Sequence, residues 1–257
     1  MCGRYATTQT SASLHQAFEV DLANSFVELE ADYNMAPTKL APVLIGRRSE
    51  EPTAGQPPQR ELLTARWGLI PSWAKDPSIG NRMINARSET VAEKPAFKKA
   101  FAKRRALVPA DGYFEWYASP VDPDGAKEQK KPKKQPFYIT PKDRSVMAMA
   151  GLYEFWRGSE SDDWIISYTI LTTTAEDELG HVHERMPLFL EPDGFDDWLD
   201  PAPHPPERLL ELLTPAAPGR LDAFPVSTAV NNVRNNGPEL IVPLPPEPLE
   251  PETPPTE

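Results

Sequence analysis

The chain of 257 residues has a single cysteine, Cys2, and only four histidines. One cysteine excludes an internal disulfide, so we expect a protein of a reducing compartment, the cytoplasm. No apolar run approaches the roughly 20 residues that a membrane-spanning helix needs, so we expect no membrane partner. The residues after Met1 also lack the apolar stretch of a signal peptide, so we expect no export.

Positive charge is scarce as well, with 27 Lys and Arg against 38 Asp and Glu and a formal net charge of −11. This excludes a uniformly basic surface, but the charge is spread unevenly, because residues 81–135 hold 13 Lys or Arg and 7 Asp or Glu. Association with nucleic acid depends on the local field, so an acidic chain can still carry a basic groove. We interpret the lysines of 127–134 as a solvated loop.

The predicted strands outnumber the predicted helices and do not alternate regularly with them. This pattern favours an α+β fold with a mixed or antiparallel, partly barrel-like sheet and peripheral helices. We predict one domain over residues 2–242 and a disordered tail over 243–257, which has seven prolines, four glutamates and no periodicity. We expect a monomer.

Apolar periodicity locates the individual elements. Strands are predicted at 42–46, 62–70, 106–108, 113–117, 136–140, 145–153 and 164–173. Helices are predicted at 11–19, about 95–103, 195–199 and 206–213, with a further short helix before His181. Polar loops are predicted at 49–60 and 118–135, the second of them rich in Pro and Lys and mobile.

Cys2 carries the most distinctive chemistry of the sequence. A small second residue permits removal of Met1, and a chain that begins with Cys2 has an amine and a thiol on adjacent carbons. Such a pair condenses with an aldehyde to an imine, which the thiol closes to a five-membered thiazolidine. The pKa of an α-amine is about 7.7–8.0 against about 10.4 for lysine, so more of it is neutral and nucleophilic at pH 7. Taken in isolation, a cysteine near the terminus is about equally often functional and without a function.

Two further groups can transfer protons. Glu115 lies between Phe114 and Trp116, where desolvation would raise its pKa and suit it to proton transfer, although strand alternation taken alone favours a side chain in water. His181 and His183 form an H-x-H pair. We expect no metal and no cofactor, because Cys2 is the only cysteine and no H-E-x-x-H spacing is present. An acid or base role for one histidine is the preferred interpretation.

Four sequence blocks, taken together and in this order, resemble one known family. They are Cys2–Tyr5, Ile84–Thr90, Asp111–Trp116 and His183–Pro187. The chain resembles the SOS-response-associated peptidase (SRAP) family of proteins that shield abasic sites in DNA, from Cys2 to about Val242. The resemblance implies an α+β domain that binds single-stranded DNA and links covalently to an abasic site through Cys2.

The resemblance also implies roles for individual residues. The implied catalytic residues are Cys2, Asn85, Glu115 and His183, and the implied DNA-binding residues are Arg4, Asn34, Trp67, Arg87 and Arg185. Trp67 can be a stacking surface or a core side chain, and its sequence context favours the core. Where the family often has a second arginine, this chain has Met186. We expect a cytoplasmic protein that joins the nucleoid when it is bound to DNA.

Three other functions are compatible with the same residues. An N-terminal-nucleophile amidohydrolase also begins Met-Cys-Gly, but it continues with apolar residues where this chain has Arg4. A cysteine peptidase would use the Cys2 thiol on a peptide bond, including the bond between Met1 and Cys2. A non-enzymatic single-strand-binding module would need a basic groove and would not need Cys2.

Overall fold

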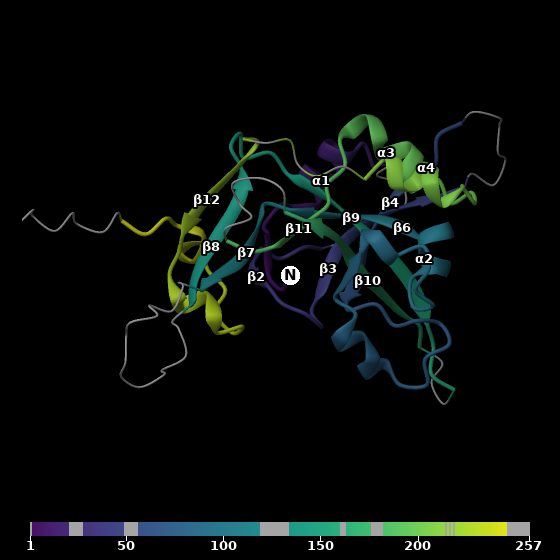
Figure 1. Cartoon of the computed structure of the whole chain (residues 1–257), viewed down its shortest axis with the longest axis horizontal. Helices are drawn as coiled ribbons and strands as arrows, with labels where there is room; N and C mark the ends of the chain where they lie inside the picture. The colour runs from purple at the N-terminus through teal and green to yellow at the C-terminus, as the bar shows by residue number, and fades with distance from the viewer. Residues whose placement is uncertain are drawn as a thin grey trace, which may run out of the picture.

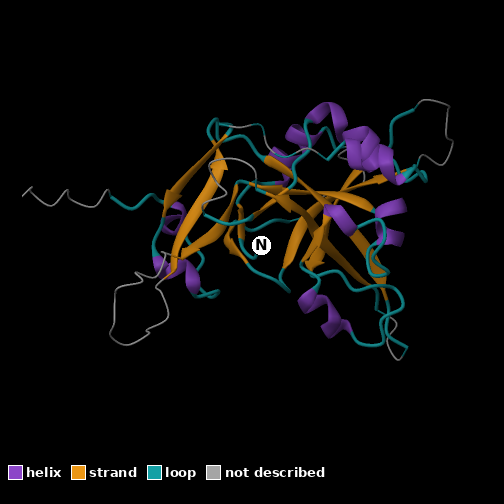
Figure 2. Cartoon of the chain, in the orientation of Figure 1, coloured by secondary structure: helices purple, strands orange, loops and turns teal. Residues whose placement is uncertain are grey.

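The computed structural model describes residues 2–20, 28–48, 56–118, 134–159, 163–175, 182–213, 215, 217 and 219–245. Two β-sheets form most of the molecule, and short helices lie around them (Figures 1 and 2). The predicted α+β class with a mixed, partly barrel-like sheet is confirmed. Within these residues, no helix combines the length and apolar composition that crossing a membrane requires.

The first sheet is antiparallel and has five strands. In order of pairing they are β12 (Leu221–Pro225), β8 (Lys134–Pro141), β7 (Gly112–Ala118), β1 (Tyr5–Thr7) and β2 (Asp32–Met35). Tyr5 of β1 lies opposite Tyr113 on one side and Met35 on the other. The strand that follows Cys2 is therefore held between two neighbours inside the sheet.

The second sheet is mixed and ring-like. Its path runs through β11 (Arg185–Pro187), β10 (Ile165–Thr174), β4 (Gln59–Trp67), β3 (Leu40–Arg47), β6 (Arg105–Ala110) and β9 (Met147–Trp156), and β5 (Asn85–Arg87) pairs with β10. β10 also pairs with β9 in antiparallel fashion and with β4 and β5 in parallel fashion. This central strand therefore has four neighbours, of which β4 and β5 come from much earlier in the chain.

The helices are short and peripheral. They are α1 (Ser11–Phe18), α2 (Lys98–Lys103), α3 (Phe195–Leu199) and α4 (Pro206–Glu211), with 3₁₀ turns at Pro77–Arg82, Ser88–Thr90, Pro192–Gly194, Thr228–Asn231 and Pro238–Ile241. Thr10 caps α1, because its side-chain oxygen accepts a hydrogen bond from Ser13 N at 3.1 Å. Helix α2 begins later than predicted, because residues 94–97 form turns after Pro95.

The buried side chains form three clusters. The first lies between the two sheets and contains Cys2, Tyr5, Trp67 and Tyr168. The second lies on the opposite face of the mixed sheet, under α1, α2 and α3, and the third lies on the outer face of the five-stranded sheet against Val230. The sequence near the N-terminus thus enters the core between the two sheets.

Five short strands were not among the predicted ones. They are β1, β2, β5, β11 and β12, each of three to five residues. A strand of this length has too few alternations for a period of two to be recognised. The expected helix before His181 and the centre of the loop 118–135 lie outside the described residues, as does the tail from residue 246. The domain division therefore stays a prediction.

Candidate active site between the two sheets

Cys2 lies at the seam between the sheets, just before β1, and its side chain is fully buried. Asn85 Nδ2 donates a hydrogen bond to the Cys2 carbonyl at 2.7 Å, which ties the start of the chain to β5. The thiol points to Arg4 O at 3.8 Å. Burial and the nearby charge of Glu115 raise the pKa of the thiol, so the neutral thiol is the stable form here.

Aromatic side chains form the floor below Cys2. The Tyr5 and Tyr168 hydroxyls are 2.6 Å apart and join the two sheets, and the Trp67 ring packs edge-on against Tyr5. Trp67 has no exposed surface, and its Nε1 donates to Ile84 O at 2.9 Å. The structure therefore corrects the stacking interpretation of Trp67, because a base can stack only on an exposed ring. Its hydrogen bond instead positions the residue before Asn85.

Glu115 reaches the seam from β7 and is 3% exposed. The alternative of a carboxylate in water is therefore wrong, because the side chain turns toward the core between the sheets. Burial raises the pKa of Glu115 to about 7. A carboxyl with such a pKa exists in both protonation states at neutral pH, which is the property of an efficient proton donor and acceptor.

His183 lies next to Glu115, with Nε2 at 4.0 Å from Glu115 Oε2. Its Nδ1 accepts a hydrogen bond from Arg185 N at 2.9 Å, so in the neutral ring the proton is on Nε2, toward the carboxyl. Burial lowers the pKa of His183, which favours this neutral ring. His181 lies outside the described residues. Within the described part of the chain, no three His, Cys, Asp or Glu side chains gather as they would around a metal ion.

Arg185 holds β11 in place. Its guanidinium makes two hydrogen bonds to the Glu89 carboxylate, at 2.6 and 3.0 Å, and a third to Thr172 O at 2.6 Å. Only 8% of the residue is exposed. The two terminal nitrogens of the guanidinium therefore bind protein groups in this structure, and a phosphate contact of Arg185 stays a prediction. Glu89 is in turn kept ionised, since this pairing lowers its pKa.

Arg4 and Asn34 also bind protein groups. Arg4 Nη1 donates to Asn34 Oδ1 at 2.6 Å and to Val230 O at 2.9 Å, and its guanidinium lies over the Trp116 ring at 5.7 Å. Asn34 is fully buried. A direct DNA contact of Asn34 is therefore excluded in this structure, whereas Arg4 remains partly exposed.

Arg87 is the implied DNA-binding residue that is exposed in the structure. It ends β5 two residues after Asn85, so its backbone is fixed by pairing with Thr172, and its exposed side chain contributes to lowering the pKa of Glu89. Sequence reasoning missed a second exposed group, Trp73, which is 53% exposed. A tryptophan that follows Pro71 in a turn-rich segment was the available signal.

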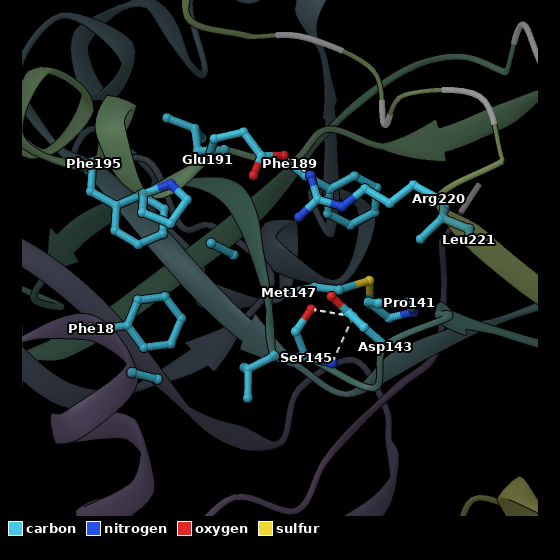
Figure 3. A pocket seen from close by; sticks show the side chains of 15 residues that line it. Phe18, Pro141, Asp143, Ser145, Met147, Phe189, Glu191, Phe195, Arg220 and Leu221 are labelled. Carbon is cyan, nitrogen blue, oxygen red and sulfur yellow. Dashed lines mark hydrogen bonds and ion pairs between the residues drawn. The ribbon is translucent and has the colours of Figure 1, made fainter.

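A well-enclosed cavity lies elsewhere in the described part of the chain. It has a volume of about 340 Å³ and is lined mostly by apolar groups of α1, α3 and the start of β9 (Figure 3). Its polar groups are engaged, since Arg220 pairs with Glu191 and Asp143 accepts hydrogen bonds from Ser145. Neither Cys2 nor Glu115 lines it. The cavity and the seam are therefore two separate places in the fold.

These features define an α+β protein in which a cysteine, an amide, a carboxyl and an imidazole from distant strands meet between two sheets. The model of the family described as SOS response associated peptidase (SRAP) matches residues 1–233. The chain therefore belongs to the SRAP family, and the resemblance of its four sequence blocks is confirmed.

Relatives of the chain agree with this assignment. It is 36% identical to "Abasic site processing protein YoqW" of Bacillus subtilis over 241 residues, which cover 94% of this chain and 99% of YoqW. It is 32% identical to "Abasic site processing protein HMCES" of Gallus gallus, with 95% of this chain and 78% of HMCES covered. A solved protein of Bacteroides thetaiotaomicron shares the fold at a TM-score of 0.75 and 24% identity, over 95% of this chain and 100% of that one.

Proposed function

We propose that this protein binds single-stranded DNA at an abasic site and forms a covalent thiazolidine crosslink with the ring-opened sugar through Cys2. The observation that carries the proposal is the convergence of Cys2, Asn85, Glu115 and His183 at one seam from four separate strands or loops. Curated relatives over nearly the whole length are named abasic site processing proteins, which supports DNA with abasic sites as the substrate.

The reaction needs a free amine on Cys2. Hydrolysis of the peptide bond between Met1 and Cys2 consumes one water and releases methionine. The amine then adds to the aldehyde carbon of the open sugar, and the resulting carbinolamine loses water to give an imine. The thiol sulfur adds to the imine carbon while its proton passes to the nitrogen. After methionine removal, aldehyde and cysteine give thiazolidine and one water, with no change in oxidation state.

The residues of the seam suit these steps. Asn85 would hold the Cys2 backbone, so that the amine and the thiol approach the same carbon. Glu115, with a pKa of about 7, would accept a proton from the attacking amine and return it to the departing hydroxyl. His183 would donate its Nε2 proton to a sugar oxygen during ring opening. The thiol would act second, since its raised pKa keeps it neutral.

The raised pKa of the thiol also separates this function from the peptidase alternative. A cysteine peptidase attacks with a thiolate, which is stabilised by a neighbouring cation or a helix N-terminus. Here burial and the charge of Glu115 act in the opposite direction. An attack that begins with the amine is favoured because it does not require the thiolate.

DNA would reach the seam along its exposed rim. Arg87 can pair with a phosphate on the strand, and Trp73 offers an exposed ring for stacking of an unpaired base. Arg4, partly exposed beside Trp116, lies two residues after Cys2 and would face the phosphates next to the abasic nucleotide.

Intact mass spectrometry of the purified protein, with and without an abasic single-stranded oligonucleotide, tests the proposal. We expect the free protein to lack Met1, and we expect a new mass equal to the sum of protein and oligonucleotide minus one water. An undamaged oligonucleotide of the same sequence is the control and should give no adduct. Retention of Met1 together with no adduct on abasic DNA would overturn the proposal.

A further inference from the structure

The segment 231–236, Asn-Asn-Val-Arg-Asn-Asn, forms an exposed loop after the 3₁₀ turn Thr228–Asn231, and we name it the asparagine loop. Val233 at its tip is 46% exposed, and Arg234 beside it is exposed as well. Arg234 makes no ion pair with another described residue. An exposed apolar tip next to a cation that is not neutralised is unusual in a chain of net charge −11.

Buried side chains hold the backbone of this loop. Asn34 Nδ2 lies within hydrogen-bond distance of three carbonyl oxygens, those of Val230, Asn232 and Asn235, at 3.3, 3.1 and 2.9 Å. Arg4 Nη1 adds a bond to Val230 O and another to Asn34 Oδ1. Arg4 and Asn34 therefore bind the backbone of the loop. A buried amide with several hydrogen bonds of this kind holds the backbone in one conformation.

The ends of the loop have anchors of their own. Trp116 Nε1 donates to Asn231 Oδ1 at 2.7 Å. At the other end, Asn236 Oδ1 accepts from Tyr33 N at 2.7 Å and its Nδ2 donates to Ala31 O at 3.1 Å. The loop is thus exposed yet tied down at its start, centre and end, and such preorganisation lowers the entropic cost of binding a partner.

The Arg4 anchor also places the loop beside the seam. Arg4, which donates to Val230 O at the start of the loop, lies two residues after Cys2, whereas Trp116 follows Glu115 on β7 and points to the opposite face of the sheet. In Figure 1 the yellow C-terminal segment lies beside β8 and β12, and its 3₁₀ turns contact β2 and β8. A strand that reaches Cys2 would therefore pass the asparagine loop.

We propose that the asparagine loop is a wall of the DNA-binding surface, with Arg234 paired to a backbone phosphate and Val233 against a base or sugar of the unpaired strand. The inference rests on the proposed function and adds a contact to it. Arg4 and Asn34 are positioning residues for this wall. A phosphodiester strand fits because it supplies the negative charge and the apolar base faces that the tip of the loop can meet.

Affinity for an undamaged single-stranded oligonucleotide, measured by fluorescence anisotropy at several salt concentrations, tests the contact. Arg234→Ala should raise Kd by about threefold to tenfold and reduce the slope of log affinity against log salt by about 0.7, the share of one phosphate on a single strand. Arg208→Ala is the control, since it removes another exposed guanidinium, one on α4 that pairs with Asp197. It should leave both quantities unchanged. Arg234→Lys should restore the slope.

A double-mutant cycle tests whether the anchors work through Arg234. Asn236 is exposed, so Asn236→Ala loosens the loop without opening the core. It should weaken binding in the wild-type background and have much less effect in Arg234→Ala. An unchanged salt slope in Arg234→Ala, or fully additive effects of the two substitutions, would overturn the inference. Adduct formation by the wild type is recorded separately, so failure of the crosslink and failure of this contact are distinguishable.

Discussion

The seam around Cys2 and the cavity beside α1 differ in what fills them. The cavity has a volume of about 340 Å³, a mostly apolar lining and an Arg220–Glu191 ion pair among its lining groups. The seam is tightly packed, but it holds Glu115 with 3% exposure and a pKa raised to about 7. The cavity offers far more space for a ligand than the seam does.

The two glutamates explain why size is the weaker guide. Glu191 is about half exposed and pairs with the guanidinium of Arg220. Glu115 is buried beside His183, whose own pKa is lowered, so no full positive charge of that ring compensates the carboxylate. A cavity shows where a molecule can fit, whereas a buried carboxyl with a perturbed pKa shows where a proton can move. Four experiments can break or sharpen this contrast.

The largest expected effect belongs to Cys2. Cys2→Ala should abolish the stable adduct with abasic DNA, because the thiol that closes the ring is absent. Cys2→Ser keeps the amine and should form an imine that borohydride traps. Ser145→Ala, at the cavity, should crosslink at the wild-type rate. Denaturing gels with a labelled oligonucleotide measure all three, and a stable adduct from Cys2→Ala would rule out the thiazolidine.

Glu115 should have the next largest effect. Glu115→Gln removes the proton-transfer group without changing its size and should slow adduct formation by about 10²–10⁴-fold. Glu191→Gln makes the same chemical change at the cavity and should have no effect on the rate. Single-turnover kinetics at saturating DNA give the comparison. Equal rates for Glu115→Gln and the wild type would show that Glu115 does not transfer a proton in the reaction.

His183 should have a smaller effect than Glu115. His183→Ala should slow ring opening or a later step of strand cleavage or adduct reversal by about 10²-fold, the lower end of general acid–base catalysis. His181→Ala should have less effect, because it is His183 whose Nε2 lies 4.0 Å from Glu115 Oε2. Rates are compared with and without a chelator. Equal loss in both histidine variants together with full inhibition by the chelator would indicate a metal instead.

The last expected effect is on stability. The pKa of Glu115 is raised from 4.5 to about 7 in the folded protein, so folding favours the protonated carboxyl. This contribution is fully present below pH 4.5 and is lost as the pH rises through 7, an amount on the order of 3 kcal/mol. Glu115→Gln should be free of this loss. Urea unfolding of both proteins at pH 5 and pH 8 measures it, and parallel pH dependences would contradict the raised pKa.

The sequence predicted the long elements well and the short ones poorly. The strands at 145–153 and 164–173 correspond to β9 and β10, and the helix at 195–199 corresponds to α3. These segments have enough residues to show their periodicity. β1, β5 and β11, which hold the site residues in place, have three residues each and are formed by pairing with distant strands.

The arginines and the asparagine of the site show a second limit of prediction from the sequence, which concerns the partners of polar side chains. Sequence blocks implied DNA contacts for Arg4, Asn34 and Arg185, but the structure uses these side chains to hold a loop and a strand. A side chain able to bind a phosphate can equally bind a carboxylate or a carbonyl. Only its neighbours in space decide between these partners, and they lie up to 226 residues away in the chain.

The sequence by itself determined the fold class, the SRAP family and the chemical potential of Cys2, because these depend on residue types, their order and local periodicity. The tertiary structure decided which of those residues can act. It buried Trp67 and Asn34, exposed Arg87 and Trp73, and set Glu115 against His183. The physical reason is that burial and opposing charge control pKa and access, and both arise only when strands far apart in the chain pack together.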